Sequence, residues 1–171
     1  MAMRDIWSIG IYTGASPLHL GQCQDEKSPH LLPEGEGQEG TRAHNPVLTA
    51  AQVTDVPATF VADPFMIRAH QTWYMFFEVL HAHWQRGVIG LATSRDGWHW
   101  QYAGVVLQEP FHLSYPYVFT WQDDYYMVPE TLEAEAIRVY RAVDFPTSWV
   151  CVGNVLAGQY ADPSLFRADG K

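Results

Sequence analysis

From about position 60 onward the chain is a series of short apolar and aromatic stretches separated by polar turn residues. Such stretches predict β-strands, and no long stretch has the 3.6-residue periodicity of an amphipathic helix. Four strands are expected first, at Phe60–Ile67, Trp73–Glu78, Val88–Ser94 and Trp100–Leu107. The dipeptide Asp96-Gly97 predicts a tight turn between the last two of these strands. The pattern therefore indicates an all-β chain.

A unit of about 50 residues occurs twice and then begins a third time. Tyr115-Pro116 follows Asp63-Pro64 by 52 positions, and Glu130 follows Glu78 by the same 52 positions. A third copy opens with Asp162-Pro163. A period of roughly 50 residues built from four short strands is typical of the blades of a β-propeller. An ordinary β-sandwich is the alternative that this pattern leaves open.

We expect the whole chain, residues 1–171, to form one partial propeller domain of about two and a half antiparallel, four-stranded blades. The expected segments are a strand at 6–12, a mobile loop at 21–45, a first blade at 60–107, a second blade at 111–156 and the start of a third blade at 160–171. The loop is predicted because Gly, Pro and acidic residues accumulate there.

Composition narrows the possible functions. The chain has 171 residues, of which 47% are hydrophobic, and this is enough for a sizeable core. Its formal net charge of −9 excludes a nucleic-acid binder, which needs a basic surface. Two distant cysteines give neither a disulfide framework nor a metal-binding spacing. No apolar run is long enough for a membrane span, and no signal peptide is recognised, so a cytoplasmic protein is expected.

The repeated motifs resemble a known superfamily. Asp63-Pro64, Tyr115-Pro116-Tyr117-Val118 and the segment from Asp162 to Gly170 are similar to the five-bladed propellers of glycoside hydrolase family 43 and its relatives. The stretch from Glu109 to Phe119 is more specific. It resembles the propeller domain of the glucosamine inositolphosphorylceramide transferase family. The resemblance implies a partial five-bladed β-propeller of which about the first half is present.

The resemblance also implies a glycan-related function and two catalytic positions. Asp63 matches the general base of the family 43 pattern, and Asp162 matches the carboxylate that tunes the acid and orients the sugar. The family's general acid is a Glu on a fourth blade, which this sequence does not contain. The chain is therefore expected to be a carbohydrate-active domain that resembles inverting glycoside hydrolases but is not competent alone. A non-catalytic glycan-binding or scaffold module is the alternative.

The motifs contain further candidates for contacts with a sugar. They are Glu78, His112, Tyr115, Tyr117 and Glu130. The two glutamates can equally be structural, because a recurring position often reflects recurring architecture. Asp63 has a structural alternative as well, since a residue before proline favours extended backbone and often caps or turns a strand.

Metal binding and cofactors are not expected. His81 and His83 lie two positions apart, so that on a strand they would share one face near Glu78. Three possible ligands on one short stretch are weak support for a metal site.

The expected partner is a glycan or a sugar-containing small molecule. A blade buries its faces against neighbouring blades, so an open array leaves one apolar face uncovered. We therefore expect further C-terminal blades, self-association of two chains, or coverage by the strand at 6–12.

Overall fold

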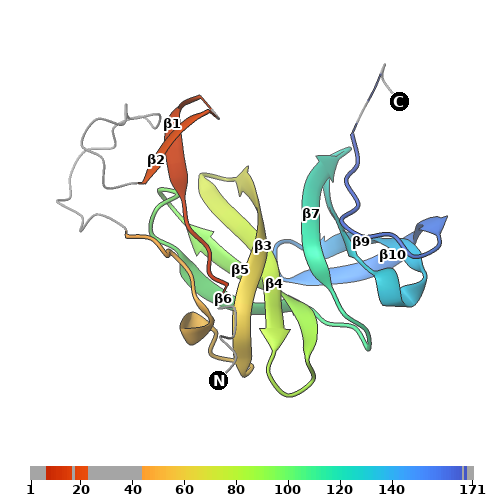
Figure 1. Cartoon of the computed structure of the whole chain (residues 1–171). Helices are drawn as coiled ribbons and strands as arrows, with labels where there is room; N and C mark the ends of the chain where they lie inside the picture. The colour runs from red at the N-terminus through yellow and green to blue at the C-terminus, as the bar shows by residue number, and fades with distance from the viewer. Residues whose placement is uncertain (1–6, 17, 23–43, 167, 169–171) are drawn as a thin grey trace.

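The computed structural model describes residues 7–16, 18–22, 44–166 and 168. The strands in these ranges form one two-stranded and two four-stranded antiparallel sheets (Figure 1). Most of the expected mobile loop at 21–45 lies outside the described residues, as does Ile6 at the start of the strand expected at 6–12.

The two four-stranded sheets are the two predicted blades. Blade 1 consists of β3 (Ala58–Ala69), β4 (Thr72–His81), β5 (Arg86–Ser94) and β6 (Gln101–Leu107). Blade 2 consists of β7 (Ser114–Trp121), β8 (Asp124–Glu130), β9 (Ala136–Asp144) and β10 (Ser148–Ala157). In each sheet the strands follow chain order, as consecutive hairpins require. The all-β prediction of four-stranded blades is confirmed.

Strand β4 is buried on both faces, which explains its nearly continuous apolar sequence. Alternate strand residues point to opposite faces. Met75 and Phe77 pack on one side of blade 1, whereas Phe76 packs on the other, and all three are fully buried. Blade 1 therefore contributes to two separate hydrophobic cores.

One core lies between the blades and the other between blade 1 and the N-terminal segment. The inter-blade core consists of Phe76, Ile89, Leu91, Leu107, Leu113, Met127, Tyr140 and Trp149. The N-terminal core consists of Ile9, Leu48, Val53, Val61, Met75, Phe77, Val79, Val88, Ala92 and Trp100. In Figure 1 the two blades stand side by side, and the N-terminal segment lies on the side of blade 1 away from blade 2.

The two cores use equivalent positions of the repeat. Met75 pairs with Ala92 in blade 1, and Met127 pairs with Tyr140 in blade 2. The first pair belongs to the N-terminal core and the second to the inter-blade core. Blade 1 thus covers one face of blade 2, and the N-terminal segment covers the equivalent face of blade 1.

The N-terminal segment contains less strand than expected. Its short elements are β1 (Tyr12–Ser16), β2 (His19–Gln22) and the 3-10 helix η1 (Ala50–Gln52). The strand expected at 6–12 is wrong for the residues described, because only an isolated bridge joins Ile9 to Leu48. The side chain of Asn45 accepts a hydrogen bond from Ile11 N and donates one to Ile11 O, both at 2.8 Å. The side-chain amide of Asn45 therefore makes the two hydrogen bonds to Ile11 that the backbone of a neighbouring strand would otherwise make.

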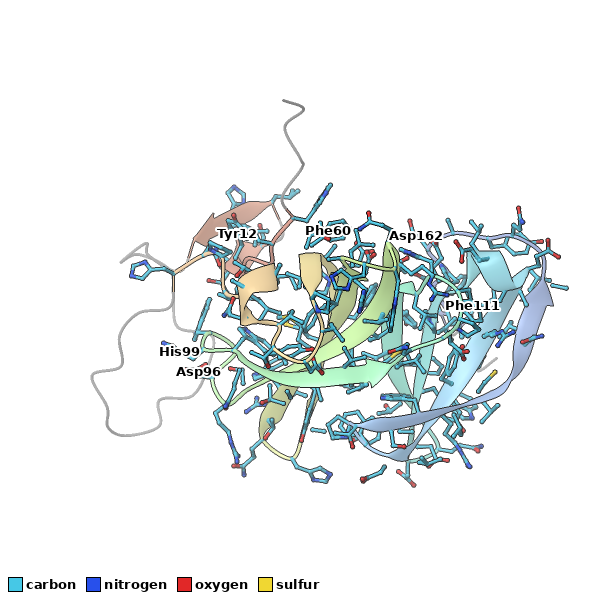
Figure 2. All side chains as sticks on the ribbon, turned by 90° about the horizontal axis from the view of Figure 1, so that it is seen from below. Tyr12, Phe60, Asp96, His99, Phe111 and Asp162 are labelled. Carbon is cyan, nitrogen blue, oxygen red and sulfur yellow. The ribbon has the colours of Figure 1, made fainter. Side chains whose placement is uncertain are left out.

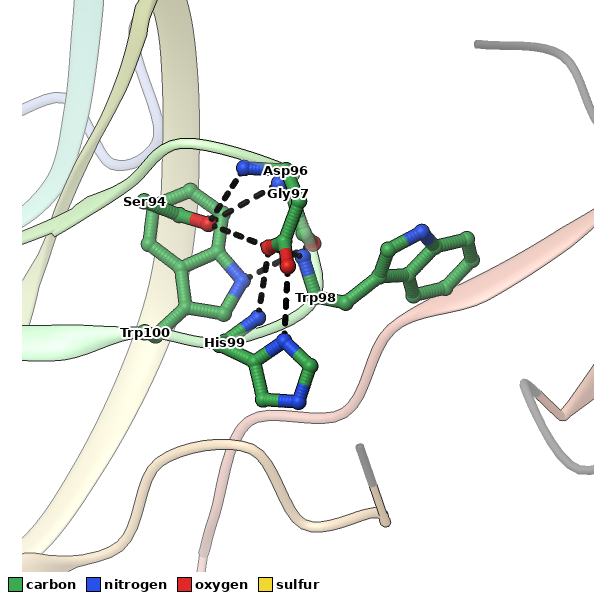
Figure 3. Close-up of polar contacts among 6 residues, drawn as sticks. All are labelled: Ser94, Asp96, Gly97, Trp98, His99 and Trp100. Carbon is green, nitrogen blue, oxygen red and sulfur yellow. Dashed lines mark hydrogen bonds and ion pairs between the residues drawn. The ribbon is translucent and has the colours of Figure 1, made fainter. Parts of the chain in front are cut away.

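The β5–β6 turn confirms the role predicted for Asp96-Gly97. Asp96 Oδ1 accepts hydrogen bonds from Ser94 Oγ, Trp98 N and His99 N, and Gly97 has φ +81° (Figure 3). The left-handed region favours glycine. In both blades a tryptophan ring closes this turn: Trp100 Nε1 donates to Gly97 O at 3.0 Å, and Trp149 Nε1 donates to Pro146 O at 2.9 Å.

Residues 160–166, expected to start a third blade, form no regular strand, although they run beside β7. Tyr117 Oη donates to Leu165 O at 2.8 Å, and Tyr115 Oη lies 3.5 Å from Ser164 Oγ. Side-chain contacts, rather than a ladder of backbone hydrogen bonds, hold this segment beside β7. It extends the row of inner strands formed by β3 and β7.

Truncation of Phe76 should destabilise both blades together. Phe76 is fully buried and meets Trp149 of blade 2 edge-to-face at 5.5 Å. We expect Phe76→Ala to lower the free energy of unfolding by about 3–5 kcal/mol, as removal of a buried Phe usually does. Urea denaturation measures this, with Met66→Ala, at a position 46% exposed, as the control. A loss no larger than the control's would contradict the proposed importance of the inter-blade core.

Candidate functional site

The residue before the recurring proline has the same unusual backbone conformation in all three units. Asp63, Tyr115 and Asp162 have φ of +51°, +46° and +48°. The extended backbone considered as the structural alternative for Asp63 is therefore wrong. Non-glycine residues rarely adopt the left-handed region, and such residues gather at sites where surrounding structure enforces them.

Irregular strand pairing enforces this conformation in the two complete blades. The β3–β4 register shifts between Ala62 and Phe65, and the β7–β8 register shifts between Ser114 and Tyr117. A bulge of this kind leaves residues out of the ladder and turns their side chains away from the regular alternation. Asp63 and Tyr115 lie inside these two bulges, so the repeat places both at the same point of an inner strand.

Aromatic contacts bring the inner strands together. The ring of Phe65 meets the rings of Tyr115 and Tyr117 edge-to-face, with centroids 4.7 Å and 5.8 Å away. Tyr117 then reaches the third segment through its bond to Leu165 O. The hydroxyl of Tyr117 is thus engaged in holding the chain together, and a sugar contact by either tyrosine stays a prediction.

The two glutamates of the repeat each contact the beginning of the next unit. Glu78 Oε1 lies 3.4 Å from His112 Nε2, just before β7. Glu130 Oε2 accepts a hydrogen bond from Asp162 N at 3.1 Å, at the third unit. In Figure 2, Asp162 and Phe111 lie on the blade 2 side of the molecule, away from Tyr12, Asp96 and His99. The glutamates therefore link successive units at the inner strands.

Glu78 is the most perturbed carboxyl group of this region. It pairs with Ala62, next to Asp63 in the chain, and the residue is only 5% exposed. Burial, followed by the negative charges of Asp63 and Glu130, raises the pKa of Glu78 to about 7. The site thus combines a carboxyl group that holds a proton near neutral pH with neighbouring carboxylates.

Hydrogen bonds fix the tautomer of His112. Gly87 N donates to His112 Nδ1 at 3.0 Å, so in the neutral ring the proton is on Nε2, which faces Glu78. The backbone N of His112 donates to Glu133 Oε2 at 3.0 Å. In this neutral tautomer the imidazole presents an N–H group toward Glu78 Oε1, 3.4 Å away.

Sequence reasoning missed Gly87. A Cβ at this position would lie 2.1 Å from Leu113 O and 2.8 Å from Glu78 Oε1. Only glycine lets the backbone approach both His112 and Glu78 this closely. A glycine inside a strand pattern is a general signal of close backbone approach, and it is the one signal that could have identified this position.

The weak metal candidates lie at the end of β4 and in the turn that follows it. His81 is 4% exposed, and its Nδ1 accepts hydrogen bonds from the backbone N of His83 and of Trp84, each at 3.3 Å. Its ring stacks on Trp84 with centroids 3.8 Å apart. Within the described ranges, no group of three or more His, Cys, Asp or Glu side chains is placed to hold a metal ion. These contacts give the buried ring of His81 a structural role.

The structure thus brings together five predicted residues, which we call the acidic site: Asp63, Glu78, His112, Glu130 and Asp162. Tyr115 and Tyr117 border it, and His81 and His83 do not belong to it. Glu133 and Gly87 support it through His112. Chemically, protonated Glu78 can donate a proton or a hydrogen bond, and the other carboxylates can accept several hydrogen bonds.

Comparison with protein families identifies the chain. Residues 3–171 match the family described as glucosamine inositolphosphorylceramide transferase 1, N-terminal. The chain belongs to this family. Proteins named glucosamine inositolphosphorylceramide transferase 1 are 38% identical over 167 residues in Oryza sativa subsp. japonica and 35% identical over 168 residues in Arabidopsis thaliana. These alignments include 96% of this chain but only 22% and 21% of the two relatives.

Solved structures confirm the fold class. A Bombyx mori GH32 β-fructofuranosidase in complex with sucrose matches 74% of this chain and 30% of its own, with a TM-score of 0.55 and 14% identity. A second structure of that enzyme gives a TM-score of 0.52 at 17% identity. At such identities the likeness shows the fold alone, and it supports a partial propeller over a sandwich. No helix among the described residues is long and apolar enough to cross a membrane.

The raised pKa of Glu78 makes a prediction about stability. The folded chain keeps the Glu78 proton up to a pKa of about 7, whereas the unfolded chain loses it near the ordinary glutamate pKa of 4.5. Since the folded state binds more protons in this window, the free energy of unfolding should fall as pH rises from 4.5 to 7. The fall attributable to Glu78 is on the order of 2 kcal/mol.

Glu78→Gln should remove this contribution. Urea denaturation at a series of pH values compares the variant with wild type, and Glu135→Gln, which makes the same change at an exposed position, is the control. If Glu78→Gln and wild type lose stability in parallel over this pH range, Glu78 is ionised in the folded protein and the assignment fails.

Proposed function

We propose that this domain recognises a sugar, and that the sugar carries an amine bound at the acidic site. The observation that carries the proposal is the burial of Glu78 beside Asp63 and Glu130, with the imidazole of His112 3.4 Å away. Clustered carboxyl groups create a negative electrostatic potential, which a bound ammonium group would neutralise.

The chemistry of the site agrees with an amino sugar. Carboxylates accept hydrogen bonds from sugar hydroxyl groups and make stronger, charge-assisted bonds to an ammonium group. The relatives found by comparison are named glucosamine inositolphosphorylceramide transferase 1, and a solved structure of similar fold was obtained with sucrose. These names support a carbohydrate ligand, and the charge of the acidic site supports the amine.

A hydrolase-like reaction is the second candidate, favoured by one specific observation. Glycoside hydrolysis needs one protonated carboxyl group and one carboxylate. Glu78 holds a proton near neutral pH and lies beside Asp63, and a carboxyl group whose pKa is raised toward neutrality is typical of a general acid. In this reading Asp63 is the base, Glu78 replaces the general acid expected on a fourth blade, and Asp162 is the auxiliary carboxylate.

Isothermal titration calorimetry tests the amino-sugar proposal. An ammonium group beside Glu78 favours its ionised form, so binding of glucosamine should release a proton. We expect the measured heat at about pH 6.5 to depend on the ionisation enthalpy of the buffer. N-Acetylglucosamine, whose nitrogen is uncharged, is the matched control and should bind at least about tenfold more weakly. Equal affinity for the two sugars would contradict recognition of the amine.

Substitution of Asp63 tests the site itself. Asp63→Asn keeps the shape and the tolerance of left-handed backbone but removes the charge, so it should abolish glucosamine binding and leave the thermal unfolding midpoint nearly unchanged. Asp123→Asn is the matched control, because Asp123 also has a positive φ, +69°, in the β7–β8 turn. An unfolded Asp63→Asn protein whose folded fraction binds normally would identify Asp63 as a structural residue.

A further inference from the structure

The turn between β4 and β5 presents an exposed tryptophan that the acidic site does not include. Residues 82–85 form this turn, and Gln85 N donates to His81 O across it at 2.9 Å. Trp84 is 45% exposed. A large aromatic side chain that stays in contact with water offers apolar area to a ligand.

The ring of Trp84 is held in place by its neighbours. The ring of His81, which is buried, stacks on it with centroids 3.8 Å apart and an angle of 5° between the planes. His81 is itself fixed, because its Nδ1 accepts hydrogen bonds from the backbone N of His83 and of Trp84. The guanidinium carbon of Arg86 lies 5.7 Å from the Trp84 centroid. A side chain fixed in this way loses little conformational entropy when a ligand packs on it.

The fold does not require an aromatic ring at this turn. In blade 2 the turn between β8 and β9, residues 131–135, contains no aromatic residue. Thr131 Oγ1 closes it through hydrogen bonds with the backbone of β9. The tryptophans that recur in both blades, Trp100 and Trp149, are buried. Trp84 is therefore a feature of blade 1 alone, and packing of the repeat does not account for it.

The turn and the acidic site lie at the same end of blade 1. Strand β4 continues for three residues beyond Glu78, about 10 Å, before the turn begins. Arg86 Nη1 donates to Pro110 O, two residues before His112, and His112 Nε2 lies 3.4 Å from Glu78 Oε1. A single sugar ring is too short to touch both Glu78 and Trp84, whereas an oligosaccharide can.

We propose that Trp84 forms a second sugar subsite, on which one ring of an oligosaccharide packs while an amino sugar of the same chain occupies the acidic site. The inference rests on the proposed function for its ligand class and extends the ligand beyond a single sugar. The C–H groups of a sugar ring form an apolar face that packs on an aromatic ring without any charge. His83, exposed beside Trp84, can add hydrogen bonds to sugar hydroxyl groups.

Isothermal titration calorimetry with glucosamine and with its β-1,4-linked trimer tests the subsite. We expect Trp84→Ala to weaken binding of the trimer about tenfold and binding of glucosamine far less. Trp84→Phe, which keeps an aromatic ring, should retain most of the affinity for the trimer. The matched control is Trp121→Ala, because Trp121 is 43% exposed at the end of β7 and should bind both sugars like wild type. Circular dichroism checks that each variant is folded.

The N-acetylated trimer separates failure of the subsite from failure of the proposed function, since its rings can pack on Trp84 but carry no ammonium group. Binding of this trimer that depends on Trp84, without binding of glucosamine, supports the subsite and contradicts recognition of the amine. If glucosamine binds and Trp84→Ala binds the glucosamine trimer as tightly as wild type, the subsite is overturned and the proposed function stands. Absence of binding by all three sugars overturns both.

Hydrogen exchange of the wild-type chain keeps the test decisive if Trp84→Ala fails to fold. Backbone amides of residues 82–85 should gain protection with saturating glucosamine trimer and stay unchanged with saturating glucosamine. Unchanged exchange in this turn with the trimer bound, or equal protection by the two ligands, overturns the subsite.

Discussion

Burial of both faces of blade 1 is the constraint on which the rest of the structure depends. A four-stranded sheet with apolar residues on both sides is stable in water only when each side is covered. Blade 2 covers one side through Phe76 and Leu107, and the N-terminal segment covers the other through Ile9 and Leu48. The same requirement applies to blade 2, whose face away from blade 1 leaves Val150 and Leu156 exposed among the described residues.

The acidic site is a consequence of this packing. When the blades pack side by side, their inner strands meet, and the bulges at Asp63 and Tyr115 lie at that meeting point. Glu78 is buried because blade 2 brings His112 against it, and its raised pKa follows from that burial together with the charges of Asp63 and Glu130. Fold stability and site chemistry therefore depend on the same inter-blade contact, and a change that separates the blades would affect both.

Much of the fold could be predicted from the repeat. The spacing of Asp63-Pro64 and Tyr115-Pro116, with Glu78 and Glu130 at the same interval, predicted two equivalent blades and most of the acidic site. The strand expected at 6–12 was wrong because Asn45, distant in sequence, supplies its hydrogen bonds to Ile11. The expected extended backbone of Asp63 was wrong because the β3–β4 register shift enforces another conformation.

By itself, the sequence determined the strands, their repeat, and which residue types recur at each blade, because alternation and spacing are local properties of the chain. The tertiary structure alone decided which segments meet. It placed Gly87 against His112 and Glu78, turned Nε2 of His112 toward Glu78, and left Leu156 exposed where Leu107 is buried. These outcomes depend on contacts between residues far apart in the chain, and local patterns do not specify such contacts.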